Sequence, residues 1–499
     1  MIENINRAGD NMKDNISVSI LDVNNKERYI DNLKNIKEKI NDLNIKTGVF
    51  DVCIHFDIMD SKFVPNTGIN IESISYAKKL GFYIDVHLMV EEPVKEKYVD
   101  RAIDLGADNI TIHYEISNFE KNLNYLIDKK RKLKEKENRD LSIGVALKPK
   151  TKVDILKKYK SKINKILLMS VEPGFGGQKY IKSTYDKIIF AKNIFPKIDV
   201  QVDGGLNEET IPKSIRNGVN SIVIGSYLSK ESNLDLLFEK FLLVNVIHTI
   251  EKLPRRANMK LDATTLQVVP GGYGENDILL GINVPDIRKC ALMWYKYINL
   301  NILLYFITSK YHDYRRFAVF CLINKISILY KKVIKDKKDK KSLKELKDIF
   351  NFFEDNIEYI NNWDLTDVSG PNILAYNLYT LSEKQRRKKI FMYLNNKNFW
   401  VKRIGIVSQL NFVRNGLLEL PLQVCNYVLY DEFHLYQKAT GWVLRELYKK
   451  EPKVIVEYLC DKNHEKKLPS ILLSYACEKM TKSEKDRIRN EIGEWKWLE

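Results

Sequence analysis

Cysteine is scarce in this chain of 499 residues, and long apolar runs are missing. The six cysteines have no paired spacing, which excludes a disulfide framework and predicts buried thiols in a reducing compartment. Residues 1–14 contain no apolar run, and no later stretch is long and apolar enough to span a membrane. We therefore expect a cytoplasmic protein with no secretory signal and no membrane partner. The cysteines are Cys53, Cys290, Cys321, Cys425, Cys460 and Cys477.

Acidic residues are also in deficit, and the deficit is uneven along the chain. Residues 1–250 contain 39 Lys+Arg against 35 Asp+Glu, whereas residues 251–499 contain 43 against 30. The second half therefore holds most of the net charge of +17, and a polyanionic partner is expected there. A generally Lys-rich composition is the simpler explanation of any single lysine run. We interpret the run 331–344 as a solvated loop between helices that can also reach phosphates.

The first half alternates short β-branched runs with amphipathic stretches, from about residue 16 to residue 243. Eight such runs with helices between them predict a (β/α)₈ TIM barrel, an α/β fold, over residues 1–245. An open, doubly wound sheet is the weaker alternative, because no Gly-rich dinucleotide-binding turn follows the first strand. The predicted strands are 17–21, 52–57, 84–89, 109–113, 143–147, 166–170, 200–203 and 221–224.

Polar side chains fall at the carboxyl ends of three predicted strands. His55 and Asp57 are two residues apart, so on a strand they point to the same face. His87 lies in the third strand, and Asp203 ends the seventh. A lone histidine on a strand is usually an ordinary core residue. Two His and two Asp meeting at one rim instead predict a site for one divalent metal ion such as Zn, Fe, Mn or Co.

Glycine clusters follow the sixth, seventh and eighth predicted strands. Glycine lets backbone N–H groups approach an anion, and the last βα loops of a barrel are the usual phosphate cradle. One cluster alone is consistent with a simple turn, but three on one rim predict a phosphorylated substrate. The residues concerned are Gly174, Phe175, Gly176, Gly177, Gly204, Gly205, Gly225 and Ser226.

Several motifs of this half resemble ribulose-phosphate 3-epimerase: HFDIMD at 55–60, FVPN at 63–66, DVHLM at 85–89, MSVEPGFGGQ at 169–178 and VDGG at 202–205. The resemblance implies the metal ligands His55, Asp57, His87 and Asp203, with Asp57 and Asp203 also the acid/base pair. It implies a substrate lining that includes His87 and also Ser19, Met59, Met89 and Met169. It implies the exchange of ribulose 5-phosphate and xylulose 5-phosphate, with another ketose phosphate such as allulose 6-phosphate as the alternative. Ser61 departs from the family, which usually has Gly there.

After about residue 270 the strand-like runs give way to helical periodicity almost throughout. Apolar faces recur in nine segments, which predicts stacked helix pairs in an all-α, HEAT-like solenoid over residues 270–499. Residues 246–269 are interpreted as a linker or a divergent first helix. The nine segments are 287–298, 317–330, 346–361, 390–394, 401–412, 420–429, 440–447, 454–459 and 470–479.

Two tryptophans and an aspartate stand out in the helical half. Trp363 and Asp367 are four residues apart and share a helix face. The motifs NWDLTD at 362–367, WVKR at 400–403 and ATGWVLRE at 439–446 resemble AlkD-like DNA alkylation repair glycosylases. The resemblance implies double-stranded DNA as partner, Asp367 as the catalytic carboxylate, Trp363 and Trp442 beside the lesion, and Arg403 on the DNA backbone. No cofactor is expected in this half.

Two hypotheses compete for the whole chain. The first is a fusion of an epimerase with a glycosylase that excises purines alkylated at N3 or N7. The second keeps the active epimerase and treats the helical half as a non-catalytic DNA-binding module. In both cases the chain can form oligomers through the barrel.

Overall fold

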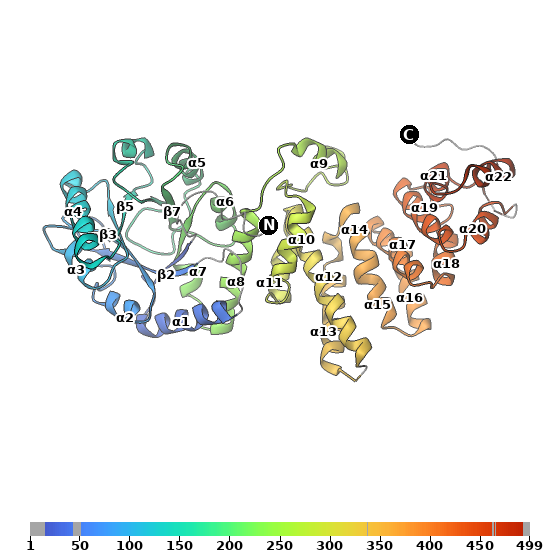
Figure 1. The fold of residues 1–499 in the computed structure, drawn as a ribbon, viewed down its shortest axis with the longest axis horizontal. Coiled ribbons are helices and arrows are strands. Elements are labelled where there is room, and N and C mark those ends of the chain that lie inside the picture. The colour runs from blue at the N-terminus through green and yellow to red at the C-terminus, as the bar shows by residue number, and fades with distance from the viewer. Residues whose placement is uncertain (1–14, 43–50, 337, 462–463, 465, 493–499) are drawn as a thin grey trace. The chain divides into compact units, whose positions relative to one another are not determined.

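Eight parallel strands close into a barrel in the first half of the chain, and helices follow in the second half (Figure 1). The computed structural model describes residues 15–42, 51–336, 338–461, 464 and 466–492. The chain divides into two units, Met1–Leu253 and Pro254–Glu499. The expectation about residues 1–14 lies outside the described residues.

The strands are neighbours in chain order, and the eighth pairs with the first. This closed order confirms the predicted barrel and rules out the open doubly wound sheet. The strands are β1 (Asn15–Ser19), β2 (Asp51–Met59), β3 (Tyr83–Met89), β4 (Asn109–His113), β5 (Ser142–Leu147), β6 (Lys165–Met169), β7 (Asp199–Asp203) and β8 (Ser221–Ile224).

The strands are buried on both faces, as expected for parallel strands that are covered by helices outside and filled by side chains inside. On β6, Leu167 and Met169 join Ala146 and Val223 in the barrel interior. The alternate residue Leu168 is equally buried and points outward. Burial on both faces is why these strands are continuous apolar runs in the sequence.

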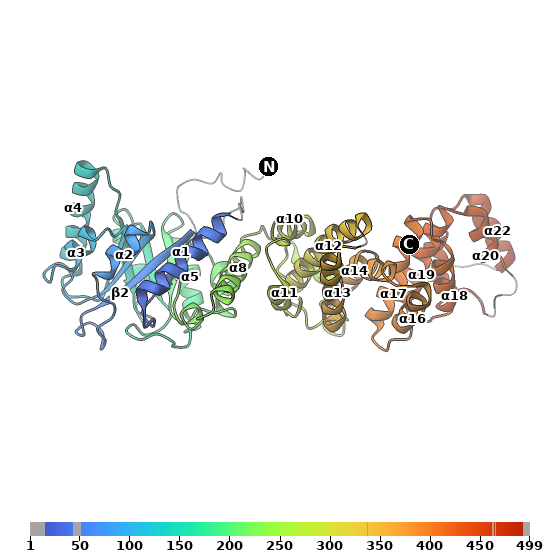
Figure 2. The ribbon, with the colours of Figure 1, turned by 90° about the horizontal axis from the view of Figure 1, so that it is seen from below.

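The helices of this unit lie outside the strands (Figures 1 and 2). They are α1 (Lys26–Asp42), α2 (Ser73–Lys79), α3 (Tyr98–Asp104), α4 (Phe119–Glu137), η1 (Val153–Tyr159), α5 (Thr184–Ile194), α6 (Thr210–Arg216), α7 (Ser226–Ser229) and α8 (Leu234–Glu251). The side chain of Asn233 caps α8 by accepting hydrogen bonds from two backbone N–H groups. Near the other end of α8, Glu251 pairs with Arg216 on α6 at 2.7 Å.

The loop after β2 contains a strained turn. Strand β2 continues two residues beyond its predicted end, to Met59, and Ser61 then adopts φ 60°. This left-handed region favours glycine, which is the residue that the resembled family usually has there. The Ser61 backbone N–H donates to the Asn66 carbonyl at 3.1 Å, which holds the turn closed. The serine is therefore accommodated at some cost in backbone strain.

Among the described residues from Pro254 onward, the regular elements are helices. Isolated β-bridges pair Arg255 with Ile282 and Ile278 with Tyr311. In both views α10 and α11 lie at one end of this unit and α20 and α22 at the other (Figures 1 and 2). The helices are α9 (Met259–Thr265), α10 (Val284–Trp294), α11 (Leu300–Ile307), α12 (His312–Lys335), α13 (Lys340–Asp355), η2 (Ile357–Tyr359), α14 (Trp363–Ser369), η3 (Gly370–Leu374), α15 (Ala375–Tyr379), α16 (Glu383–Leu394), α17 (Phe399–Arg414), α18 (Glu419–Tyr427), α19 (His434–Tyr448), α20 (Pro452–Leu459), α21 (Ser470–Ala476) and α22 (Lys482–Ile492).

These helices stack in successive layers. Helix α17 packs against α14 and α19, and α19 packs against α21, while α16 and α18 flank α17 and α19. This is the predicted solenoid arrangement. One close approach requires glycine: a Cβ on Gly370 would lie 2.6 Å from the Val407 side chain and 2.8 Å from the Ile404 carbonyl oxygen. The absence of a side chain there lets η3 and α17 come together.

The interpretation of residues 331–344 as a loop is wrong for most of the run. Helix α12 continues to Lys335, and α13 begins at Lys340 with Asp339 as its cap. Lysine is a good helix former, and its charged end reaches water from a helix as easily as from a loop. A lysine run therefore predicts solvent exposure but not the end of a helix.

All six cysteines are free thiols, and all but the half-buried Cys460 are buried, as predicted. Among the helices that the structure describes, none combines the length and the apolar character that crossing a bilayer requires.

Candidate functional site

Four side chains converge at the carboxyl-terminal mouth of the barrel. His55 and Asp57 come from β2, His87 from β3 and Asp203 from β7, and one ligand atom of each lies within 4.8 Å of the others. The parallel register pairs Asp57 with His87, and strand alternation turns His55 to the same face as Asp57. Side chains that are far apart in the sequence thus form one compact group.

The geometry of this group fits a cation. The His55 Nε2 atom lies 3.4 Å from Asp57 Oδ1 and 4.0 Å from Asp203 Oδ2, while His87 Nδ1 lies 3.2 and 3.8 Å from the same two oxygens. His55 Nε2 is buried and has no hydrogen-bond partner. A buried nitrogen without a partner, next to two carboxylates, is a metal-ligand arrangement. The four residues therefore can hold one divalent metal ion.

The two carboxyl groups have opposite proton affinities. Burial alone would raise the pKa of Asp57, but the charge of the neighbouring His55 and the hydrogen bond with His87 lower it well below its usual value. Burial and the nearby Asp57 charge raise the pKa of Asp203 to about 7. One carboxyl is therefore ionised where the other readily carries a proton, which is the requirement for a paired base and acid.

The predicted substrate residues border a cavity above this group. All of them except His87, which is fully buried, line it: Ser19, Met59, Met89, Met169, Gly174, Phe175, Gly176, Gly177, Gly204, Gly205, Gly225 and Ser226. Ser19 Oγ donates to Asp57 Oδ2 at 2.7 Å and so fixes the orientation of that carboxylate. Asn66 Nδ2 donates to the Gly174 carbonyl at 2.6 Å, which ties the loop after β2 to the loop after β6.

Two sets of residues behind the four predicted metal ligands were not predicted from the sequence. His55 Nδ1 contacts the buried carboxylate of Asp85 at 2.9 Å, and Lys165 Nζ lies 3.3 Å from the other Asp85 oxygen. His87 Nε2 lies 2.9 Å from His113 Nε2, and His113 Nδ1 lies 3.0 Å from Glu115 Oε2. Burial lowers the pKa of His113 to about 4. The pair of titratable residues at the end of the fourth predicted strand was the available signal.

In the helical unit, Asp367 and Arg403 form a bidentate ion pair. Arg403 Nε and Nη2 donate to the two Asp367 oxygens at 2.9 and 2.8 Å, and Nη1 donates to the Leu435 carbonyl. Burial raises the pKa of Asp367, and the Arg403 guanidinium opposes that shift. The donors of Arg403 thus point at the carboxylate that the resemblance makes catalytic. Its expected contact with the DNA backbone stays a prediction.

The two predicted tryptophans lie on different helices. Trp363 begins α14, one turn before Asp367, and its Nε1 donates to the Thr265 carbonyl at 3.1 Å. Trp442 is half-buried on α19, which packs against α17. Tyr273, outside the predicted set, contacts Trp400 edge-to-face, with ring centroids 5.1 Å apart. The end of α9 therefore packs against the start of α14, and the segment that follows α9 packs against the start of α17.

A buried ionic cluster next to Trp363 was also missed. His312 contacts Asp277 Oδ2 at 2.9 Å and Asp364 Oδ2 at 3.0 Å, and Arg316 pairs with Asp364 at 2.7 Å. Burial alone would lower the pKa of His312, but the charge of Asp364 and the hydrogen bonds with Asp277 and Asp364 raise it. The cluster joins three segments and fixes the start of α14.

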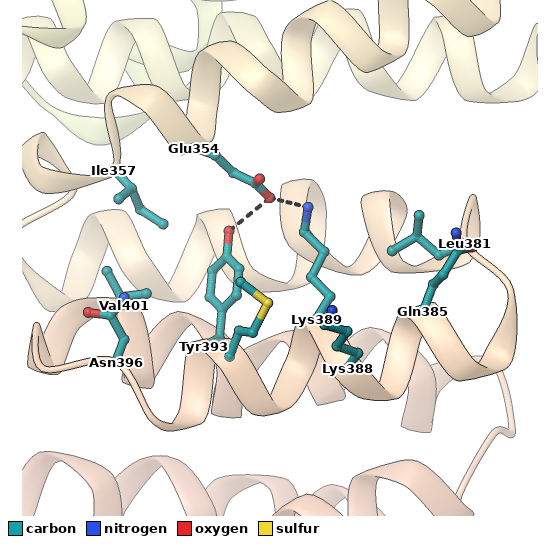
Figure 3. Close-up of a pocket in the computed structure, with 10 residues that line it drawn as sticks. Glu354, Ile357, Leu381, Gln385, Lys388, Lys389, Tyr393, Asn396 and Val401 are labelled. Carbon is teal, nitrogen blue, oxygen red and sulfur yellow. Dashed lines mark hydrogen bonds and ion pairs between the residues drawn. The ribbon is translucent and has the colours of Figure 1, made fainter.

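The helical unit also has an open groove of about 410 Å³ between the end of α13 and α16 (Figure 3). In it, Glu354 accepts hydrogen bonds from the Tyr393 hydroxyl at 3.2 Å and from Lys389 at 2.5 Å (Figure 3). None of the predicted site residues lines this groove. Of the charged groups that line it, Glu354 and Lys389 are paired with each other.

The first unit is a (β/α)₈ barrel protein with a two-His, two-Asp group at the mouth where barrel enzymes carry their chemistry. Residues 15–229 match the ribulose-phosphate 3 epimerase family. The chain belongs to this family. Similar proteins include ribulose-phosphate 3-epimerase of Eremothecium gossypii, 37% identical over 35% of this chain and 73% of that protein. The enzyme of the same name from Bacillus subtilis is 35% identical over 36% of this chain and 81% of that protein.

Residues 251–480 match a second family, described as DNA alkylation repair enzyme. A predicted DNA alkylation repair enzyme from Enterococcus faecalis, known as a solved structure, is 17% identical. It aligns over 46% of this chain and all of its own length, with a TM-score of 0.34.

Proposed function

We propose that the barrel unit catalyses 3-epimerisation of a ketopentose phosphate, interconverting ribulose 5-phosphate and xylulose 5-phosphate. The observation that carries this proposal is the pairing of Asp57 and Asp203, two carboxyl groups with opposite pKa shifts within one His/Asp group. Family membership and the names of the relatives support the choice of substrate.

The chemistry follows from the acid/base pair. Epimerisation at C3 removes a proton from a carbon next to a carbonyl and returns one to the opposite face, so two groups must act in turn. Asp57, held ionised by His55, accepts the proton, and Asp203 supplies one from its protonated form. A divalent ion held by His55, Asp57, His87 and Asp203 would stabilise negative charge on the substrate oxygens. Ser19 keeps the Asp57 carboxylate in place.

The rim loops are the expected phosphate site. Gly204 and Gly205 have positive φ values of 109° and 64° after β7, a backbone shape that turns N–H groups toward an anion. The buried methionines Met59, Met89 and Met169 offer an uncharged lining for the sugar carbons.

The test is a direct epimerase assay with ribulose 5-phosphate and with allulose 6-phosphate, using purified full-length protein supplied with Zn, Fe, Mn or Co. We expect faster turnover of the pentose phosphate. Faster turnover of the hexose phosphate would keep the reaction type and change the substrate. No turnover of either with any metal would contradict the proposal.

For the helical unit we propose excision of N3- or N7-alkylated purines from double-stranded DNA. The specific observation in favour is the position of Asp367 on α14, the helix that begins with Trp363. Arg403, on α17, holds both oxygens of the Asp367 carboxylate. Such a lesion is cationic, and its loss passes through a positively charged sugar that a nearby carboxylate stabilises. Indole faces attract the same positive charge.

Release of 7-methylguanine or 3-methyladenine from alkylated DNA tests this second activity. Asp367→Asn should abolish release while DNA binding, weakened steeply by salt, persists. Binding without release by the unmutated protein would favour the non-catalytic DNA-binding module instead. We further propose no cofactor in the helical domain, oligomers through the barrel, and a cytoplasmic location.

A further inference from the structure

We propose that His113 and Glu115 form an outer pair that fixes the ring of His87 with Nδ1 toward the metal position. The inference rests on the proposed metal-dependent function of the barrel and assigns a positioning role to two residues behind the ligand group. Neither residue reaches the cavity at the barrel mouth. Their effect on a bound ion therefore passes through His87.

The proton positions follow from the distances. His87 Nδ1 lies 3.2 Å from Asp57 Oδ1, so Nδ1 is the nitrogen that faces the other ligand atoms. A nitrogen that binds a metal carries no proton, and the proton of His87 must then be on Nε2. Within the described part of the chain, His87 Nε2 has Nε2 of His113, at 2.9 Å, as its hydrogen-bond partner. His113 must accept there, which places its own proton on Nδ1.

Glu115 completes the arrangement. His113 Nδ1 lies 3.0 Å from Glu115 Oε2, so its proton has a carboxylate acceptor. The other Glu115 oxygen accepts from the Lys148 backbone N–H at 2.8 Å and from the Thr151 hydroxyl. Glu115 is therefore anchored to the loop after β5, and one set of proton positions satisfies every contact from Glu115 to His87.

The surrounding packing keeps both imidazoles in place. His87 and His113 are fully buried, and their ring centroids lie 5.0 Å apart. The Phe63 ring lies 4.6 Å from His113, and Lys148 Nζ lies 3.9 Å from the centre of the Phe63 ring. With water excluded, a lost hydrogen bond here has no ready replacement.

The second histidine ligand has a different support. His55 Nδ1 reaches the Asp85 carboxylate directly at 2.9 Å, which leaves Nε2 free to face the metal position. His87 reaches its carboxylate only through the second imidazole, His113. A metal-bound histidine commonly donates its other ring N–H to a carboxylate or a carbonyl, and loss of that acceptor typically weakens metal binding about 10- to 100-fold. We expect the same for His113.

The experiment is a Co²⁺ titration of metal-depleted full-length protein, followed by visible absorption, with Zn²⁺ competition for the dissociation constant. His113→Phe keeps a ring but removes the acceptor, and it should raise the dissociation constant at least about 10-fold. His113→Gln restores an acceptor oxygen and should recover most of the affinity. Glu115→Gln, which removes only the charge, should fall between these variants. Tyr114→Phe is the matched control. Tyr114 stands between His113 and Glu115 in the sequence, and its ring contacts Phe119.

The outcomes separate the inference from the function. A dissociation constant of His113→Phe within twofold of the unmutated protein overturns the inference while leaving the epimerase proposal intact. If His113→Phe does not fold, an unchanged affinity in Glu115→Gln overturns it. Absence of Co²⁺ and Zn²⁺ binding by the unmutated protein also overturns it. Metal binding without epimerase turnover refutes the proposed function, and the ranking of affinities still tests the pair.

Discussion

The two units solve the problem of a buried carboxylate in opposite ways. At the barrel mouth, Asp57 and Asp203 crowd together, and His55 Nε2 stays without a hydrogen-bond partner. In the helical unit, Asp367 has both oxygens on the guanidinium of Arg403. The first site is electrostatically incomplete, whereas the second carries its own cation.

This difference separates sites that need an added ion from sites that do not. Crowded carboxylates destabilise the fold until a cation neutralises them, so the barrel site is poised to bind one. A bidentate pair is already neutral, and breaking it exposes an unpaired buried charge. Removal of the Asp203 charge should therefore stabilise the metal-free barrel, whereas removal of the Arg403 charge should destabilise the helical unit.

The largest expected effect is on catalysis. Asp203→Asn removes one member of the proposed acid/base pair and should lower kcat for ribulose 5-phosphate about 10²- to 10⁴-fold. A coupled assay of xylulose 5-phosphate formation measures it. Asp199→Asn, at the amino end of the same strand, is the control and should change kcat little. Turnover by Asp203→Asn within twofold of the unmutated protein would remove Asp203 from the mechanism.

Stability of the helical unit gives the next effect. Arg403→Met leaves Asp367 buried without its partner and should destabilise this unit by about 3 kcal/mol. Urea denaturation followed by tryptophan fluorescence is specific for it, because all six tryptophans lie after Pro254. Arg387→Met is the control, since the pairs of Arg387 with Glu383 and Glu419 are exposed and contribute little.

The barrel should respond in the opposite direction. The raised pKa of Asp203 means that its ionisation costs folding free energy as pH rises from the ordinary aspartate range through about 7. In metal-free protein at pH 8, Asp203→Asn should therefore stabilise the barrel by about 1–3 kcal/mol. Far-UV circular dichroism follows the unfolding of both units. The transition that has no counterpart in the tryptophan fluorescence is then the unfolding of the barrel. Destabilisation of the metal-free barrel by this variant would contradict the comparison.

Metal addition tests the same contrast without a mutation. A divalent ion at 100 times its dissociation constant should stabilise the barrel by about 2.7 kcal/mol. The tryptophan-detected transition of the helical unit should stay where it was. Asp203→Asn should lose the metal response. A shift of the tryptophan transition would show that the helical unit also binds the ion.

The smallest effect concerns pH. The carboxylates of Asp364 and Asp277 raise the pKa of His312 despite burial, so protonated His312 stabilises the helical unit. This contribution is complete below the ordinary histidine pKa of about 6.5 and is lost as pH rises through the raised value. The urea midpoint should therefore fall between pH 6 and pH 9, and His312→Gln should flatten this dependence. An equal slope in both proteins would exclude His312 as its source.

Much of the barrel was predictable because strand signals are local. Runs buried on both faces are β-branched and continuous, and the spacing of His55 and Asp57 fixes their common face. The predicted strand 52–57 ends two residues too early, because the polar Asp57 suggests the end of a strand. Ile58 and Met59 continue β2. The lysine run 331–344 misled for a related reason: its composition indicates exposure and not backbone shape.

The partners of the site residues were harder to predict. His113 and Glu115 look like any core histidine and surface glutamate until β3 and β4 pair. The pairing of Arg403 with Asp367 depends on how α14 packs on α17, which no single segment encodes. A sequence predicts what each segment presents on its surface, whereas these partners depend on contacts between segments.

Gly370 sets the distance between η3 and α17, and thereby the distance from the acid on one helix to the guanidinium on the next. A methyl group there would meet Val407 and the Ile404 carbonyl before it met any reactant. In a saturation-mutagenesis screen of the proposed excision activity, scored by survival after methylating damage, Gly370 should rank with Asp367, although Gly370 is buried. Such a screen should therefore show as little tolerance of substitution at Gly370, which sets a distance between helices, as at Asp367.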